Sequence, residues 1–360
     1  MNFYHHRDTE NTEVTQRRYG EKQMSELKRL AKKSKNLIIA AKIVDNWKMK
    51  RRFAAGNTES LHGATHSLFF TNIQESLDYI NIQINDYLRY SGLTIEQLKG
   101  MRIFELGFGD NVGVALKFIA AGAERAVCLD KYYSKRDLGQ QQQIYKALRE
   151  TLNDEEKKRF DTAVDLSSGI DLNPEKVLCI YGTDVENANQ LFEMKPFDLS
   201  ISRGAIQDIY TPDAAFAAMD RMLAPGGYML HKIDLSDQGM FRDNGMNPLT
   251  YLTVPESVYR LMAVDSGKPN RKLMGYYRRI MNDLGYKDAK LLITGLIGVG
   301  ACGKGDLHPH KEKVELNVDY PASTLETVRE IRPRLTSEFK ALPDDELIVD
   351  GIFIVARKPQ

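Results

Sequence analysis

A short apolar run followed at once by a glycine turn constrains this chain more than any other feature. Residues 102–113 read RIFELGFGDNVG. We expect a buried strand over 102–106, a turn at Gly107 and Gly109, and a helix over about 111–121, where apolar residues recur. A glycine turn between strand and helix lets the backbone approach a ligand that side chains would otherwise exclude. The pattern predicts an α/β unit with a binding site at the turn.

An acidic residue closes the next predicted strand. The run at 125–129 reads RAVCL and is followed by Asp130. An acid at the tip of the second strand is where a ribose diol is held by two hydrogen bonds. Glu105 stands beside the turn, and the third glycine of a dinucleotide-binding turn is missing. A nucleoside without a pyrophosphate fits this arrangement, so the sequence favours S-adenosylmethionine over the nicotinamide dinucleotide of a dehydrogenase.

Composition narrows the partners and the compartment. The formal net charge of +1 gives no case for nucleic-acid binding. No apolar run reaches the roughly 18–20 residues that span a bilayer, and the N-terminus lacks an apolar signal core. The three cysteines, Cys128, Cys179 and Cys302, show no paired spacing. We therefore expect a cytoplasmic protein without a transmembrane segment.

The first 95 residues are predicted to form a helical extension, or lid. Residues 36–52 favour one helix, and apolar residues spaced by three or four from Phe69 to Leu88 favour the core face of another over 66–90. Residues 1–60 carry 14 Lys and Arg against 7 Asp and Glu. This basic face suits an anionic acceptor or peripheral contact with an anionic membrane. A solvated helix face or a contact within a homo-oligomer is the plainer interpretation.

Strands and helices alternate after residue 95, which is typical of a parallel sheet covered on both faces. The predicted strands are 102–106, 125–129, 176–181, 197–202, 227–233, 289–294 and 347–356. The predicted helices between them are 111–121, 137–150, 187–193, 212–222 and 271–284. Two insertions are expected, at about 151–173 and 295–345.

The second insertion has a less regular pattern than the rest of the chain. Residues 295–305 contain five glycines and favour a loop, in which we expect the nearby His308 and His310 to be solvated. Alternating apolar and polar residues over 314–320 predict a half-buried strand. A helix is expected from about 324 to 340.

The chain resembles the class I S-adenosylmethionine-dependent methyltransferases. The resemblance covers about 95–360 and depends on four elements in the right order. They are ELGFG at 105–109, Asp130, GTDV at 182–185 and LAPGG at 223–227. It implies a Rossmann-like α/β fold with a seven-stranded, mostly parallel sheet, whose last strand is antiparallel. The cofactor would lie over the carboxyl ends of the first four strands.

The resemblance also implies a set of cofactor-binding residues. The implied residues are Glu105, Gly107, Phe108, Gly109, Asp130, Lys131, Asp184, Val185, Ser202 and Arg203. The glycine turn would approach the methionine part, and Asp130 would bind the ribose hydroxyls with Lys131 beside it. Asp184 would bind the adenine amino group, and Val185 would offer its backbone N–H to the ring. The serine and arginine after the fourth strand would line the sulfonium end.

A narrower similarity exists to methyltransferases found with bacterial surface-polysaccharide and other glycan biosynthesis genes. The matching text is HKIDLSD at 231–237, NPLTYLT at 247–253 and PNR at 269–271. Two positions depart from that pattern, because Gln238 replaces a second histidine and 207–208 reads Gln-Asp instead of Glu-His. Both departures fall where the acceptor is expected.

Methyl transfer from a sulfonium to a hydroxyl requires alignment and the removal of a proton. We expect His231, at the end of the fifth strand, to act as the base and Asp208 or Asp234 to orient it. A structural histidine at a strand end is the alternative. A divalent-metal cluster of these three residues with Asp237 is also considered, but no metal is expected.

The resulting expectation is methyl transfer to a small polar acceptor, with O-methylation of a sugar or glycan-pathway metabolite as the leading hypothesis. An N- or O-methyltransferase of a non-sugar natural product is the first alternative. A methyltransferase-like binding module without turnover is the second, because the departures lie near the acceptor while the cofactor residues are intact.

Overall fold

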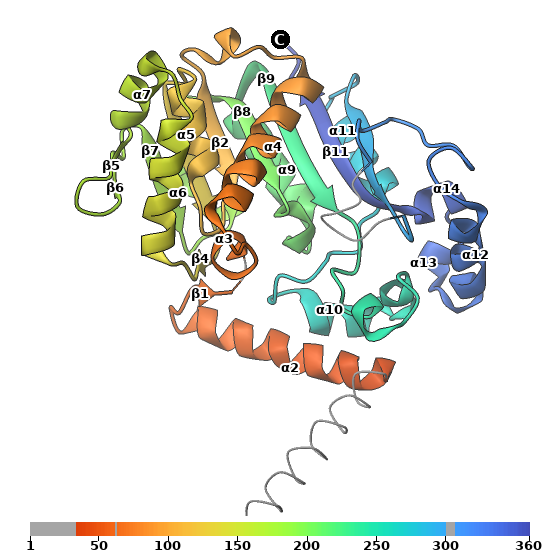
Figure 1. Ribbon diagram of the computed structural model, residues 1–360. Helices are drawn as coiled ribbons and strands as arrows, with labels where there is room; N and C mark the ends of the chain where they lie inside the picture. Colours follow the sequence, from red (N-terminus) through yellow and green to blue (C-terminus); the bar gives the residue numbers. More distant parts are fainter. Residues whose placement is uncertain (1–33, 62, 300–306) are drawn as a thin grey trace, which may run out of the picture.

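Seven strands form one central sheet in the order β10-β11-β9-β8-β2-β3-β7 (Figure 1). This is a computed structural model, which describes residues 34–61, 63–299 and 307–360. The strands are β2 (Arg102–Leu106), β3 (Arg125–Asp130), β7 (Val177–Tyr181), β8 (Phe197–Arg203), β9 (Leu223–Asp234), β10 (Lys290–Leu296) and β11 (Val349–Arg357). The last strand, β11, is antiparallel to both of its neighbours, and the other pairs are parallel. The predicted Rossmann-like fold is confirmed.

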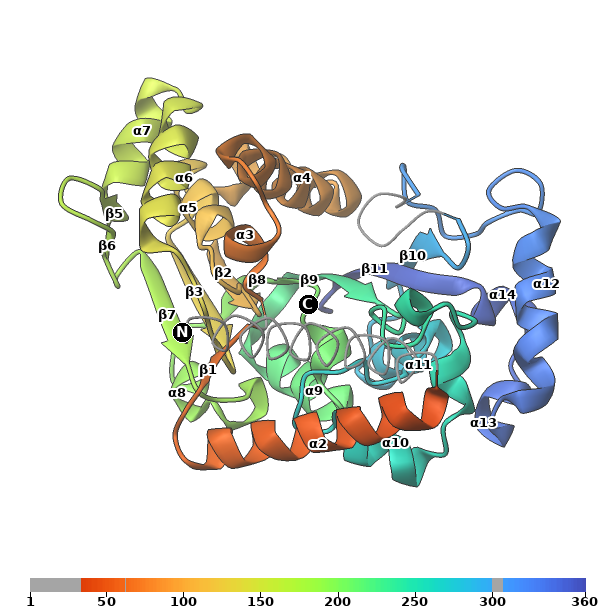
Figure 2. The ribbon, with the colours of Figure 1, turned by 60° about the horizontal axis from the view of Figure 1, so that its bottom comes forward.

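Helices cover both faces of this sheet (Figure 2). On one face lie α4 (Ile73–Ser91), α5 (Gly113–Ala120), α6 (Leu138–Glu150) and α7 (Asp154–Asp161). On the other lie α8 (Asn189–Phe192), α9 (Pro212–Met222) and α11 (Met274–Asp283). Successive strand residues point to opposite faces, so Ile103 packs with the first group and Phe104 with the second. Two apolar cores result, which is why these strands read as continuous apolar runs.

Residues 34–61 and 63–95 form several separate elements beside the sheet. They are α2 (Lys35–Ala54), β1 (Glu59–Ser60), α3 (Thr65–Leu68) and α4. The single helix predicted over 66–90 is therefore two helices. Asn72 causes the break, because its side chain accepts a hydrogen bond from the Glu75 N–H and caps a new helix at 3.0 Å. Phe69, predicted to be in the core, is 74% exposed in the gap.

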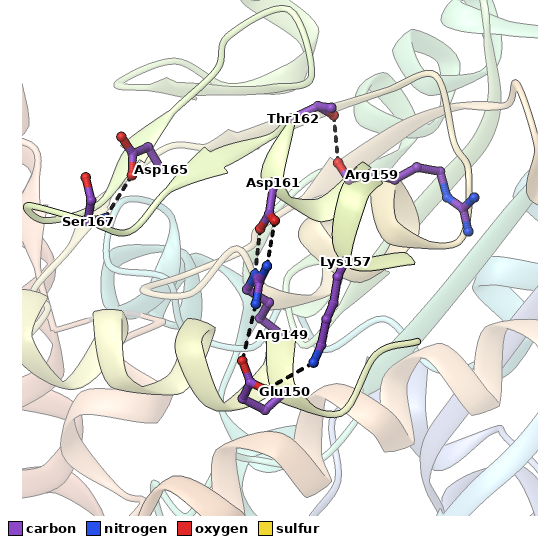
Figure 3. Close-up of polar contacts among 8 residues, drawn as sticks. All are labelled: Arg149, Glu150, Lys157, Arg159, Asp161, Thr162, Asp165 and Ser167. Atoms are coloured by element: carbon purple, nitrogen blue, oxygen red, sulfur yellow. Dashed lines mark hydrogen bonds and ion pairs between the residues drawn. The ribbon is translucent and has the colours of Figure 1, made fainter. Parts of the chain in front are cut away.

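The insertion predicted between the second and third strands contains α7 and a small hairpin of β5 (Val164–Asp165) and β6 (Asp171–Leu172). Its polar contacts join α7 to the end of α6 (Figure 3). The Arg149 guanidinium donates to both oxygens of Asp161, at 2.6 and 2.7 Å, and Lys157 donates to Glu150. Exposed ion pairs contribute little, so the fully buried Phe160 is the main anchor of this insertion.

The second insertion differs from the prediction. Residues 314–320 form no strand; Asn317 adopts a φ of 65° and Val318 is 70% exposed. The turn at Asn317 reverses the chain after three residues, so the alternating pattern never reaches a sheet. The helix predicted over 324–340 is divided at Pro333, which lacks an N–H and clashes with the preceding turn. It forms α12 (Ala322–Ile331), a 3-10 turn and α13 (Ser337–Lys340), which precede α14 (Asp344–Leu347).

The remaining elements are short. They are β4 (Tyr133–Ser134), α10 (Glu256–Ala263) and 3-10 helices at Glu96–Leu98, Val185–Asn187, Ile206–Asp208, Arg242–Asn244, Thr250–Thr253 and Arg332–Arg334. The basic segment before residue 34 and the glycine-rich stretch around Cys302 lie outside the described residues. None of the helices in the described part combines the length and apolar character needed to cross a membrane.

Truncation of the insertion's anchor tests this packing. We expect Phe160→Ala to lower the free energy of unfolding by about 3–5 kcal/mol, because a fully buried ring is replaced by a cavity. Lys158→Ala, on the exposed side of the same helix, is the matched control and should leave the denaturation midpoint nearly unchanged. Guanidinium unfolding followed by circular dichroism measures both. A similar midpoint for the two variants would mean that α7 is not anchored through its ring.

Candidate functional site

Two adjoining cavities lie at the carboxyl ends of the central strands. The first, here called the carboxyl-end cavity, encloses about 210 Å³, and its lining includes Leu106, Asp130, Asp184, Val185, Asp208 and Tyr210. The second, the glycine-turn cavity, is lined by Glu105, Phe108, Gly109 and Arg203 among others. Both share Gly63, Gly107 and Gly204. Ligands of open α/β sheets bind at this edge, so the cavities form the candidate site.

The glycine turn between β2 and α5 has the conformation that only glycine adopts freely. Gly107 and Gly109 have φ values of 74° and 65°. A Cβ at Gly107 would lie 2.2 Å from the Ala205 side chain, and one at Gly109 would lie 2.3 Å from the Gly63 carbonyl oxygen. The turn is therefore packed between the loop after β8 and the N-terminal segment. Any larger residue at either position would separate these parts.

Asp130 closes β3 directly beside the glycine turn. One carboxylate oxygen accepts the Gly109 N–H at 3.1 Å, and the other accepts the Tyr132 N–H at 3.0 Å. Burial raises the pKa of Asp130 to about 6, although these two hydrogen bonds and Arg136 oppose the rise. A carboxylate has about four acceptor positions. Each oxygen of Asp130 therefore keeps a lone pair for a hydroxyl group in the cavity.

The N-terminal segment closes over the glycine turn, and Asp110 holds it there. The Asp110 N–H donates to the Gly63 carbonyl at 3.0 Å, and its carboxylate accepts the N–H groups of His66 and Ser67 at 3.2 and 2.7 Å. Strand β1 also pairs with β4 just beyond Asp130. Sequence reasoning missed Asp110. Its position directly after the second glycine of the turn was the available signal.

Glu105 is buried in the glycine-turn cavity. Burial raises the pKa of its carboxyl to about 8, while the Cys128 thiol, 3.7 Å away, opposes the rise by donating to it. Phe108 is also buried and packs against the Tyr181 ring at 5.2 Å between centroids. Glu105 therefore presents a buried acid to this cavity, which Asp110 also lines. A cationic group entering it would favour the ionised form of that acid.

Arg203 brings a positive charge to the same cavity. Its guanidinium donates to the Asp86 carboxylate of α4 at 2.8 Å and lies over the Tyr79 ring. Both side chains of the ion pair are at most 10% exposed. Sequence reasoning did not single out Asp86, although it is an acid within the apolar stripe of that helix. The pair orients Arg203 toward the space beside the glycine turn.

Lys131 and Asp184 form an ion pair across the carboxyl-end cavity, 3.0 Å apart. Lys131 also lies over the Phe53 ring of α2 at 5.1 Å. Val185 begins the following 3-10 helix and is buried. Two of the residues implied for adenine and ribose binding are therefore joined to each other and to the N-terminal helix. Helix α2 packs on α10 as well, where the Asn46 side chain accepts the Asp265 N–H at 2.7 Å.

His231 is not among the residues that line either cavity. It is fully buried on β9, where Nδ1 lies 2.9 Å from the Ser202 hydroxyl and the Phe216 ring of α9 packs edge-on. Burial lowers the pKa of His231 to about 3, so the ring is neutral. Ser202 is equally buried on the neighbouring strand. The structure brings these two predicted residues together, but within the core rather than at the cavity surface.

Asp208 does line the carboxyl-end cavity. Its carboxylate accepts a hydrogen bond from the Gln238 side chain at 2.9 Å. Burial raises the pKa of Asp208 to about 7, and the Gln238 hydrogen bond and nearby Lys268 oppose this rise. Asp234 lies further along β9 and accepts the Ser236 N–H. Two of the positions that depart from the narrower sequence pattern, Asp208 and Gln238, thus contact each other.

The residues considered for a metal cluster are not grouped as ligands. Asp237 accepts the backbone N–H groups of Gly239, Phe241 and Arg242 at 2.7–2.9 Å and so caps the following turn. Within the described chain, the single grouping of metal-ligating side chains contains none of the four residues considered. That grouping includes His310, whose side chain is buried and not solvated as predicted.

Comparison with solved structures finds methyltransferases. Phosphoethanolamine N-methyltransferase 2 of Haemonchus contortus, with phosphomonomethylethanolamine and S-adenosylhomocysteine, is 15% identical over 84% of this chain and 61% of its own, with a TM-score of 0.38. NodS of Bradyrhizobium japonicum is 9% identical over 81% of this chain and 100% of its own, with a TM-score of 0.34. An O-methyltransferase of Bacillus cereus with S-adenosylhomocysteine is 12% identical over 82% of this chain and 95% of its own, with a TM-score of 0.33.

This chain spans about three fifths of the length of the Haemonchus protein. No protein-family model and no curated protein sequence matches it. Likeness at this level carries no information on function, so the chemistry of the site must come from the residues of the chain itself.

Loss of the Asp110 carboxylate should release the N-terminal segment. Asp110→Ala removes the acceptor of two backbone N–H groups, each worth about 1.5–3 kcal/mol when the acceptor is charged. We expect amides of residues 63–70 to exchange faster with deuterium and proteases to cleave there sooner. Asp78→Ala, on the exposed side of α4, is the control and should behave as the wild type. Unchanged deuterium exchange in Asp110→Ala would contradict the role of Asp110 in holding the N-terminal segment.

Proposed function

We propose that this chain transfers the methyl group of S-adenosylmethionine to a hydroxyl of a small polar acceptor, with a sugar as the leading acceptor class. The observation that carries the proposal is the shared lining of one cavity. Gly107 from the glycine turn, Asp130 and Asp184 from the next two strand ends, and Asp208 after β8 all border it. Nucleoside-binding groups and a candidate base therefore meet at one space.

The nucleoside would occupy the carboxyl-end cavity between β3 and β7. Asp130 has one free acceptor position on each oxygen, which suits the two ribose hydroxyls. Asp184 and the backbone of Val185 would bind the adenine edge, with Lys131 held alongside by its ion pair. The absence of a third glycine leaves no anchor for a pyrophosphate in this turn. A nicotinamide dinucleotide is disfavoured for that reason.

The methionine end would enter the glycine-turn cavity. Its ammonium suits Glu105, because a cation beside that buried carboxyl stabilises the ionised form. Its carboxylate suits Arg203, whose guanidinium retains donors beyond those directed at Asp86. Phe108 would cover the aliphatic part. The N-terminal segment held by Asp110 would then enclose the cofactor and exclude water from it.

Asp208 is the side chain best placed to receive the acceptor's proton. It lines the cavity, and its pKa near 7 gives a usable base at neutral pH. Gln238 donates to it and can hold one carboxylate oxygen while the other faces the acceptor. His231 is assigned a positioning role, since its neutral ring fixes Ser202 beneath the site. Asp234 would act only through the local charge.

Several features support a small polar acceptor. Beside Asp208, the cavity is lined by Tyr210 and Thr211 together with the apolar Ile209 and Val264. A carboxylate beside hydroxyl-bearing residues suits the neighbouring hydroxyls of a sugar. An amine on a non-sugar metabolite remains the second candidate, because the same carboxylate could accept a proton from an ammonium group.

Removal of the Asp130 charge should weaken cofactor binding. We expect Asp130→Asn to raise the Kd for S-adenosylhomocysteine at least about 10-fold, since hydrogen bonds to a charged acceptor contribute about 1.5–3 kcal/mol each. Isothermal titration calorimetry measures this value. Asp171→Asn, an exposed acid of the hairpin insertion, is the matched control and should bind normally. Equal affinities of the two variants would overturn the ribose assignment, and no binding by the wild type would overturn the function.

Asp208→Asn should remove turnover without removing the cofactor. A positioned base contributes about 10²–10⁴-fold, so we expect a loss of kcat in this range with an unchanged Kd for S-adenosylhomocysteine. The base must be ionised, and Asp208 loses its proton as pH rises through about 7. The wild-type rate should therefore rise over that range, and the residual rate of Asp208→Asn should lack this rise.

His231→Gln tests the rival assignment in the same assay. Formation of S-adenosylhomocysteine from S-adenosylmethionine, in the presence of each of a panel of sugars and amines, gives the rates of both variants and of the wild type. A large loss in His231→Gln with near-normal turnover in Asp208→Asn would make the histidine the base. Absence of turnover by the wild type with every acceptor, despite cofactor binding, would favour a binding module.

A further inference from the structure

Three side chains outside both cavities come together where helix α4 meets the second insertion. They are Asp86 on α4 and the two histidines His308 and His310, which follow β10. His308 Nε2 lies 3.4 Å from one Asp86 oxygen, and His310 Nε2 lies 3.9 Å from the other. All three potential ligand atoms are within 4.8 Å of one another. More than two hundred positions of sequence separate the acid from the imidazoles.

The remaining nitrogens of the two rings are already engaged. His310 Nδ1 lies 2.7 Å from the Leu307 carbonyl oxygen, which can only accept, so this nitrogen carries the proton. His308 Nδ1 lies 3.3 Å from the Tyr90 hydroxyl. A histidine that ligates a metal typically donates its other N–H to a carbonyl or similar acceptor, which fixes the tautomer. Both rings therefore present Nε2 toward the carboxylate.

His310 Nε2 is buried without a hydrogen-bond partner among the described residues. The side chain is only 1% exposed and stacks on the Tyr90 ring at 4.5 Å between centroids. A lone pair on a buried nitrogen has lost its water and gained nothing in return. A bound cation at this nitrogen would satisfy it.

The spacing of the ligand atoms is close to that of a tetrahedral site. Ligands about 2.0–2.1 Å from a Zn²⁺ ion stand roughly 3.3–3.4 Å from one another in a tetrahedron. The 3.4 Å between His308 Nε2 and Asp86 Oδ1 fits one such edge, and the other two edges lie within 4.8 Å, so that they would shorten by about 1.4 Å or less when the ion binds. Two imidazoles and one carboxylate leave a fourth position open for water. His308 is half exposed, which provides a path for the ion.

The charges at this position also suit a cation. The Asp86 carboxylate pairs with the Arg203 guanidinium at 2.8 Å. The carboxylate is therefore ionised. Arg203 donates to Oδ2, so Oδ1, which faces His308, is available as a single ligand atom. A donor on the second oxygen is a common way to orient a ligating carboxylate.

We propose that Asp86, His308 and His310 bind a divalent transition-metal ion of the zinc type. The site joins α4 to the segment after β10, next to Phe353 of the last strand. Its role is to fasten α4 to the second insertion, since none of the three metal-binding side chains lines either cavity. Neither binding nor the proposed role depends on methyl transfer, so the two proposals fail separately.

Zinc binding by the full-length chain tests the site. After chelator treatment, the protein should take up one equivalent of Zn²⁺, measured by elemental analysis, and compete with a fluorescent zinc indicator. We expect His308→Ala and Asp86→Asn to raise the Kd for zinc at least about 10-fold. Tyr90→Phe, which removes the hydroxyl beside His308 Nδ1, should weaken binding in the same direction while retaining the ring. Zinc should also raise the Tm of the wild type but not of His308→Ala.

Two controls separate this site from other sources of affinity. Glu312→Gln changes an exposed acid in the same segment and should bind zinc normally. His5→Ala with His6→Ala removes the adjacent histidines near the N-terminus and should also leave one equivalent bound. Loss of binding in that double variant, retention in His308→Ala, or failure of the wild type to hold zinc would each overturn the proposal. His308 is half exposed, so its replacement should not prevent folding.

Discussion

The packing of the glycine turn against the N-terminal segment is the constraint from which the rest of the site follows. Gly109 has a positive φ, donates its N–H to Asp130 and leaves no room for a Cβ beside the Gly63 carbonyl. The same turn therefore fixes the Asp130 carboxylate on one side and the N-terminal segment on the other. Asp110, the next residue, completes the connection through three backbone hydrogen bonds. A change in this turn would disturb both cavities together.

The central sheet could be predicted because both of its faces are buried. Strands covered on two sides require continuous apolar runs, and the seven predicted for the central sheet are the seven that form it. Helix α7, which begins at the Asn153 cap within the insertion, was not predicted. Asp130 also follows from this regularity, since it comes directly after the second predicted strand, whereas Asp184 stands three residues beyond the third and was implied by the resemblance alone. Apolar runs along the sequence were therefore sufficient to predict the strands that are buried on both faces.

Prediction failed where a pattern alone cannot tell which surface a segment meets. The alternation over 314–320 suits a strand, but a turn at Asn317 and the lack of a partner strand leave Val318 in solvent. His231 lies on the expected strand, yet the alternation of side chains along β9 places its ring against Phe216 in the core. Burial of His310 depends on Tyr90, far away in sequence. Each outcome depends on tertiary contacts that periodicity does not encode.

The departures at Gln207, Asp208 and Gln238 gain a physical meaning once the contacts are known. A histidine at either of the last two positions could carry a charge beside the acceptor, whereas the amide of Gln238 donates a neutral hydrogen bond to the carboxylate. A neutral donor opposes the rise in the pKa of Asp208 less than a cation would. The carboxylate is thus kept weakly acidic and suited to accept a proton near neutral pH. Under the proposed function, the altered pair supplies a carboxylate as the base where the narrower sequence pattern has an imidazole.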